Sequence, residues 1–187
     1  MDLPFTRIKG GVGAPKGFLT SAIGCGIKKP TGRRLDLALI ASVAPCHSAA
    51  TFTTNRVKAA PVRVSQTHLR SADMQAIVAN SGNANACTGI QGIRDAKTMA
   101  AAVAEGLGIR RTQVGVCSTG VIGLPMPMSR IEPKVPDLID RLGRRNGPEV
   151  ARAIMTSDTQ PKELAISFEL GGARVRLGGC AKGAGMI

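Results

Sequence analysis

Several apolar stretches along the chain have the length of buried strands. The clearest are residues 35–43 (LDLALIASV), 74–80 (MQAIVAN) and 112–118 (TQVGVCS), each followed by polar or glycine-bearing residues. Short apolar runs bounded by turn residues are typical of strands inside a sheet. Residues 18–27 are also small and apolar, and we predict that they are extended. Residues 49–54 (AATFTT) are predicted to form the strand next to residues 35–43.

Segments with helical spacing of apolar residues alternate with these strands. Residues 60–70 carry a proline suited to a first helical turn. The alanine-rich residues 93–107 are followed by Gly108, a typical residue at the end of a helix. Residues 136–142 and 148–155 are predicted to form two shorter helices.

Near its end the chain changes to the two-residue alternation of a hairpin. Residues 163–170 and 173–177 alternate on either side of a pair of glycines. Strands that alternate with helices, followed by a hairpin, predict an α/β (α+β) layered sandwich in which helices cover a mixed sheet. We expect one domain over residues 1–187, with the proline-rich residues 124–136 as the only candidate hinge.

Composition limits the partners of this fold. Aromatic residues make up 2% of the 187 residues, Trp and Tyr are absent, and the net charge is +13. The charge favours an acidic partner, such as nucleic acid, a carboxylate substrate or an acidic protein chain. The short basic clusters, among them residues 28–29 and 33–34, are each interpreted as solvated surface. Proteins usually stack nucleic-acid bases on aromatic side chains, so we expect no nucleic-acid partner, and a basic RNA-binding module is kept as an alternative.

The remaining composition gives no sign of a membrane or a metal. No apolar run is long enough to span a bilayer, and residues 1–13 lack a secretion signal, so we expect a cytoplasmic protein without a membrane partner. Five widely spaced cysteines without a CxxC pair argue against a disulfide framework. His47 and His68 have no partners at metal-ligand spacing, so no metal is expected. Cys117 and Cys180 rank low as nucleophiles because neither has an evident histidine partner.

Three loops that follow predicted strands are candidates for a small-ligand site: residues 80–89, 118–123 and 180–187. In sheet proteins, small ligands bind at the ends of strands. In the second loop, the turn Ser118-Thr119-Gly120 offers two hydroxyls and a flexible main-chain N–H, which suits the oxyanion of an acyl transfer. By pattern alone, the same residues are interpreted as a turn that ends a strand, because this sequence is common in turns, and that interpretation is preferred.

Other polar residues have two interpretations each. Lys182 lies between glycine and alanine neighbours, so it is predicted to present its charge to a carboxylate or an amino acid. Thr156 could bind a substrate, but Thr156-Ser157-Asp158 consists of residue types that commonly cap turns, and this second interpretation is preferred. The first loop contains three asparagines, Asn80, Asn83 and Asn85. One interpretation is that they orient a polar substrate or the loop of the site, and the other is that they form local Asx turns. No convincing nucleophile accompanies these groups, and we expect the missing half of the site on a second chain.

Six segments resemble the ornithine acetyltransferases of the cyclic arginine pathway, the ArgJ family, in order and over essentially the whole chain. They are GVGAPKGF (11–18), TTNRVKAAPV (53–62), ANSGNANACTG (79–89), VCSTGVIG (116–123), IMTSDTQPK (154–162) and GGCAKGAGMI (178–187). The resemblance implies an α chain cut from a self-cleaving precursor, and the glycine-rich end of the sequence suits the first of two pieces. It implies that the nucleophile is the N-terminal Thr of a β chain, in an α2β2 heterotetramer.

The resemblance also implies the reaction and the roles of four residues. Acetyl would pass from N2-acetylornithine to glutamate through an acetyl-Thr intermediate, without a cofactor, and acetyl-CoA is a candidate second donor. Thr119, through its hydroxyl, and Gly120, through its N–H, would form the oxyanion hole. Thr156 and Lys182 would bind the substrate. A self-cleaving aminopeptidase-like hydrolase (DmpA-like), which resembles this family in architecture, is kept as an alternative.

Overall fold

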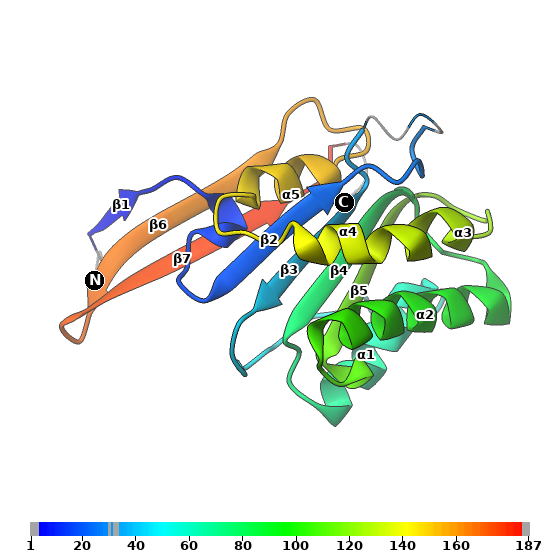
Figure 1. Ribbon diagram of the computed structural model, residues 1–187, viewed down its shortest axis with the longest axis horizontal. Helices are drawn as coiled ribbons and strands as arrows, with labels where there is room; N and C mark the ends of the chain where they lie inside the picture. The colour runs from blue at the N-terminus through cyan, green and yellow to red at the C-terminus, as the bar shows by residue number, and fades with distance from the viewer. Residues whose placement is uncertain (1–3, 30, 32–33, 185–187) are drawn as a thin grey trace.

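The computed structural model describes residues 4–29, 31 and 34–184, and its strands form two sheets (Figure 1). The larger sheet has the strand order β2-β3-β4-β5. β3 is antiparallel to both β2 and β4, whereas β4 and β5 are parallel. Its strands are β2 (Phe18–Ile23), β3 (Leu37–Ser42), β4 (Ala76–Asn83) and β5 (Val114–Val121). The smaller sheet is antiparallel, with the order β1-β6-β7. Its strands are β1 (Phe5–Arg7), β6 (Lys162–Leu170) and β7 (Ala173–Ala181).

Helices pack on both faces of the larger sheet, on one face along its whole width and on the other, through α5, at β2 and β3. The helices are α1 (Ala60–Ser71), α2 (Gly89–Leu107), α3 (Met128–Ile131), α4 (Val135–Asp140) and α5 (Gly147–Ala153), with short 3-10 turns η1 (Gly11–Gly13), η2 (Arg111–Gln113) and η3 (Glu132–Lys134). Leu37 and Leu39 of β3 join the main core with helix residues, whereas the intervening Ala38 belongs to a second cluster with Val150 of α5. The alternation along β3 therefore buries side chains on both faces of the sheet at this strand, whereas Ile77 of β4 is 39% exposed.

Helix α1 protects the outer edge of the larger sheet. Strand β5 is the last strand in the sheet order, so its outer backbone groups have no strand to pair with. The buried Ser65 hydroxyl donates to the Val116 carbonyl and accepts from the Val116 N–H, both at 2.9 Å. His68 Nδ1–H donates to the Val114 carbonyl at 2.8 Å. Two helix side chains thus satisfy backbone groups that an edge strand leaves open.

The smaller sheet carries an apolar face that the described part of the chain leaves exposed. Directly opposite residues such as Phe5 and Phe168, or Ile166 and Leu177, lie on one face. The exposed fraction is 58% for Phe5 and 61% for Leu177. The opposite face is covered only in part: Ala165 is 2% exposed and Cys180 of β7 packs on the cluster that includes α5, whereas Arg174 and Arg176 on that face are exposed.

The structure confirms the α+β class and corrects two of the predicted segments. Residues 49–54 form no strand and are mostly exposed, because β2 and β4 already occupy both edges of β3. Thr119 and Gly120 do not lie in a turn after the strand, because parallel pairing with β4 continues to Val121. None of the described helices has an apolar segment long enough to cross a bilayer.

Candidate functional site

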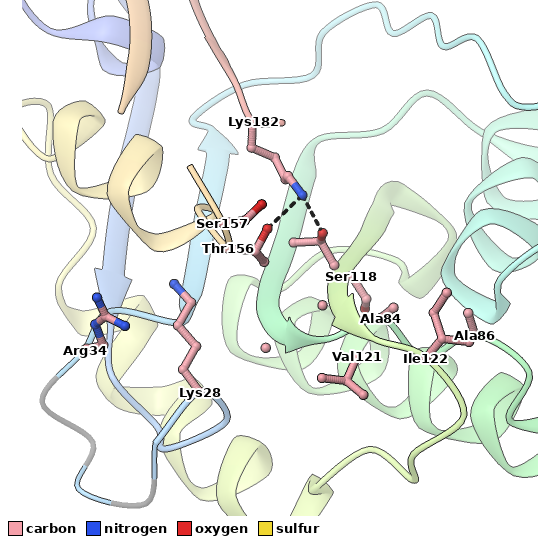
Figure 2. A pocket seen from close by; sticks show the side chains of 13 residues that line it. Lys28, Arg34, Ala84, Ala86, Ser118, Val121, Ile122, Thr156, Ser157 and Lys182 are labelled. Carbon is pink, nitrogen blue, oxygen red and sulfur yellow. Dashed lines mark hydrogen bonds between the residues drawn. The ribbon is translucent and has the colours of Figure 1, made fainter. Parts of the chain in front are cut away.

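A pocket of about 580 Å³ opens where the parallel strands β4 and β5 end (Figure 2). The loop after β2, the segment after α5 and the residue after β7 complete its wall. Its lining is formed by Lys28, Arg34, Gly82, Ala84, Ala86, Ser118, Thr119, Gly120, Val121, Ile122, Thr156, Ser157 and Lys182. All four residues that the sequence suggested for the site line this one pocket.

Lys182 connects two of the predicted site residues. Its Nζ lies 2.9 Å from Thr119 Oγ1 and 3.0 Å from Thr156 Oγ1 (Figure 2). An ammonium group only donates hydrogen bonds, so both hydroxyl oxygens accept from it. Each hydroxyl proton then remains for another acceptor. The three side chains, which come from β5, the segment after α5 and the end of β7, therefore form a compact group of N–H and O–H donors.

Gly120 is required by the close approach of β4 and β5. Its φ is +135°, and a Cβ at this position would collide with the backbone of Gly82, with the Asn83 nitrogen at only 2.6 Å. The pairing of the two strands becomes irregular at this point, between Gly82 and Asn83. Two glycines thus allow the strands to stay in contact up to the pocket.

The three asparagines hold the end of β4 and the loop after it. Asn80 Oδ1 accepts from Ser118 Oγ at 2.5 Å, and Asn80 Nδ2 donates to the Asn83 carbonyl at 2.9 Å. Asn83 Nδ2 donates to the Pro125 carbonyl at 2.9 Å, and its Oδ1 accepts from the Asn85 N–H at 2.8 Å. All three asparagines are buried and none lines the pocket. They orient the loop, and only the last of these bonds is the local Asx turn considered from the sequence.

A basic wall adjoins the pocket, and sequence reasoning missed it. Lys28 was interpreted as solvated surface, yet it is half-buried, and burial lowers the pKa of its ammonium group. Its Nζ donates to the carbonyls of Leu35 and Ala153 at 2.9 and 3.1 Å. The buried Asp36 fixes the preceding loop, because its carboxylate accepts the Ile27 N–H at 2.7 Å and the Lys28 N–H at 3.1 Å.

The charges of the lining residues are all positive. Lys28, Arg34 and Lys182 line the pocket, and no carboxylate, imidazole or thiol does so among the described residues. Such a surface favours an anionic group such as an amino-acid carboxylate. Two parts of the sequence predictions lie outside the described residues. They are Arg33 of the basic cluster at residues 33–34, and residues 185–187 of the third candidate loop.

No cysteine or histidine of the described residues lines this pocket. Burial raises the pKa of the Cys180 thiol, and the negative charge of Glu163 adds to the effect, so the thiol stays protonated near neutral pH. His68 bonds the β5 backbone, and His47 pairs with Asp73 at 3.2 Å on the surface. Within the described residues, no group of three or more potential ligands could hold a metal ion.

Comparison with known proteins gives one consistent family. Residues 19–187 match the model of the ArgJ family. Two curated relatives carry the name arginine biosynthesis bifunctional protein ArgJ. The protein from Symbiobacterium thermophilum is 49% identical over 180 residues, which cover 96% of this chain and 45% of the relative. The protein from Geobacter sulfurreducens is 51% identical over 172 residues, which cover 92% of this chain and 43% of the relative.

Two solved structures share the fold. The ArgJ protein from Bacillus halodurans has a TM-score of 0.90 and 37% identity, covering 100% of this chain and 97% of that chain. The ornithine acetyltransferase from Mycobacterium tuberculosis, solved in complex with ornithine, has a TM-score of 0.87 and 38% identity, covering 98% and 97%. The chain therefore spans less than half the length of the two curated relatives, but nearly the whole of each solved chain.

Proposed function

The chain belongs to the ArgJ family, and from this we propose that it forms one half of an ornithine acetyltransferase. The enzyme would move an acetyl group from N2-acetylornithine to glutamate in arginine biosynthesis. The name and the ornithine complex of the Mycobacterium tuberculosis relative support this substrate class. The cationic pocket at the ends of β4 and β5 is consistent with an amino-acid substrate.

The observation that carries the proposal is the donor group around Lys182. The ammonium occupies the lone pairs of Thr119 and Thr156 and so directs both hydroxyl protons elsewhere. Thr119, together with the Gly120 N–H, would then donate to an oxyanion. Thr156 and the remaining N–H of Lys182 would donate to the α-carboxylate that ornithine and glutamate share. Charge-assisted bonds of this kind are shorter and stronger than neutral ones.

The proposed reaction has two half-reactions. The hydroxyl oxygen of an N-terminal Thr on a β chain attacks the acetyl carbon of N2-acetylornithine, and its proton passes to the free α-amine. An α-amine has a pKa of about 7.7–8.0, so it can act as a base near neutral pH. The C–N bond breaks, the proton moves to the leaving nitrogen, and ornithine departs. The glutamate amine then attacks the acetyl-Thr ester, which returns the hydroxyl and releases N-acetylglutamate.

The β chain is also part of the proposal. The curated relatives are about twice as long as the matched segment, whereas the solved family chains are nearly the same length as this one. That difference supports a precursor that is cut into two chains, and the α2β2 assembly is proposed from the family resemblance alone. No cofactor is required by this chemistry, and acetyl-CoA is proposed only as a second acetyl donor.

The test is the kinetics of a Thr119→Ala variant of the complete protein with N2-acetylornithine and glutamate. Loss of one oxyanion donor is expected to lower kcat by about 10²–10³-fold. Thr119→Ser, which keeps the hydroxyl, is the matched control and is expected to retain most of the activity. An unchanged kcat in Thr119→Ala would remove Thr119 from this role. Turnover of a peptide amide in place of N2-acetylornithine would favour the aminopeptidase-like alternative.

A further inference from the structure

Asp158 joins the two segments that carry the substrate-binding candidates. The side chain of Asp158 is only 1% exposed, although it lies in an irregular segment between α5 and β6. Its Oδ2 accepts from the backbone N–H of Thr156 at 3.2 Å. Its Oδ1 accepts from the backbone N–H of Gly183 at 2.7 Å. One carboxylate thus holds the backbone of Thr156 and the backbone next to Lys182.

The charge of this carboxylate is balanced by Lys162. The Lys162 ammonium lies 2.6 Å from Asp158 Oδ1, at the first residue of β6. These bonds keep the pKa of Asp158 well below its usual range, so the carboxylate is ionised at neutral pH. An ionised carboxylate can accept all three donors at once, because it has about four lone-pair sites.

The position of Lys182 depends on this arrangement. Lys182 follows directly on β7, and after it the described backbone has no sheet partner. Its ammonium must reach Thr119 of one sheet and Thr156 of the segment after α5, at 2.9 and 3.0 Å. The bond from Gly183 to Asp158 fixes the backbone immediately after the lysine and ties it to the segment that carries Thr156.

We propose that Asp158 is a positioning residue that sets the spacing between Lys182 and Thr156, and through it the grip on the substrate carboxylate. The proposal rests on the proposed function, because it concerns how that site is kept in shape. Asp158 itself does not line the pocket of Lys182 and Thr119. It acts through the backbone of the two segments, and the bond to Lys162 is secondary.

The experiment compares Asp158→Asn with Asp137→Asn in the complete protein. Asp137 is a matched control, since its carboxylate also pairs with a lysine, Lys134, at 2.6 Å, but on the surface at α4. Asp158→Asn is expected to raise KM for both N2-acetylornithine and glutamate about tenfold, with kcat changed less than about threefold. Asp137→Asn is expected to leave both constants unchanged. Lys162→Met, which keeps the carboxylate, is expected to change KM less than about twofold.

A second measurement does not depend on activity. Amide hydrogen exchange in the complete protein is expected to become faster for residues 155–158 and 181–184 in Asp158→Asn, with the strands of the larger sheet unchanged. Unchanged exchange in both segments overturns the proposal, and so does faster exchange with unchanged KM. If Asp158→Asn does not fold, Asp158→Glu, which displaces the carboxylate by one methylene, replaces it with the same expectations. A wild-type protein without N2-acetylornithine turnover would refute the proposed function, and the exchange data would then decide on Asp158 alone.

Discussion

At the scale of single residues, Gly120 is a position in the pocket where both the backbone conformation and the neighbouring backbone exclude a side chain. Its positive φ alone makes another residue unfavourable, and the backbone of Gly82 and Asn83 occupies the space that a Cβ needs. The neighbouring Gly123 also has a positive φ, of +82°, but nothing lies within 4 Å of a Cβ there. A comparison of alanine substitutions at the two glycines therefore separates the cost of a positive φ from the cost of a collision between the Cβ and the neighbouring strand.

We expect Gly120→Ala to lower the free energy of unfolding by about 2–4 kcal/mol, the sum of backbone strain and a collision between strands. Gly123→Ala should cost about 1 kcal/mol, because only the strain applies. Denaturant unfolding of both variants measures the difference. Equal losses would mean that β4 and β5 can separate at the pocket without a penalty, contrary to their close packing.

Some site residues could be identified from the sequence and others could not. Lys182 stands out because its neighbours are glycine and alanine, and Thr119 because it follows an apolar run of residues and precedes a glycine. Lys28 gives no such signal, because its burial depends on residues that are distant in the sequence or folded against its loop. Its backbone N–H bonds Asp36, and its ammonium group bonds the carbonyl of Ala153 at the end of α5. Asp158 looks like an ordinary turn residue until Gly183 is placed beside it.

At the scale of elements, the edge of β5 is satisfied by two side chains of α1, and the Ser65 hydroxyl supplies two of the three bonds. Ser65 satisfies both the N–H and the carbonyl of Val116, and it is buried. We expect Ser65→Ala to cost about 1–3 kcal/mol in the free energy of unfolding, because two buried backbone groups lose their partner. Ser71→Ala in the same helix is the control, since Ser71 is exposed and bonds only Thr67 of its own helix. A loss no larger than that of the control would show that water or a shift of α1 replaces the hydroxyl.

The elements themselves could be largely predicted from periodicity and end signals. The core strands and the alanine-rich helix α2 appear close to the expected positions, and Gly108 ends α2 with a φ of +65° as expected. The predicted strand at residues 49–54 was wrong because strand propensity does not reveal that both edges of β3 are already paired. The extension of β5 through Gly120 depends on parallel pairing with β4, which lies far away in the sequence.

At the scale of the whole molecule, the exposed apolar face of the smaller sheet is the main departure from an ordinary surface. The exposed residues on it include Phe5, Leu164, Leu170 and Leu177, all more than half exposed. Contiguous apolar surface of this kind is typical of an interface with another chain. The length that the relatives carry beyond the matched segment makes the proposed β chain its expected partner.

We expect the double change Leu164→Ser and Leu177→Ser to raise the soluble yield of this chain expressed alone and to weaken its copurification with the β chain. Both effects follow from the loss of apolar area on one face. Arg176→Ser, at a β7 position that alternates to the other face, is the matched control. Unchanged copurification in the double variant would place the β chain on another surface.

The pairing of β1 with β6 has a consequence for how the protein is made. Phe5 lies opposite Phe168, so β1 stays without its partner until β6, at the other end of the described residues, has been translated. At about 5–20 residues per second, this delay lasts on the order of 10–30 s. During that time the larger sheet and its helices can assemble, whereas the segment bearing Lys182 does not yet exist. The part of the pocket that this chain supplies is therefore completed only after translation has passed the hairpin of β6 and β7, and Phe5 of β1 has no strand to pair with until then.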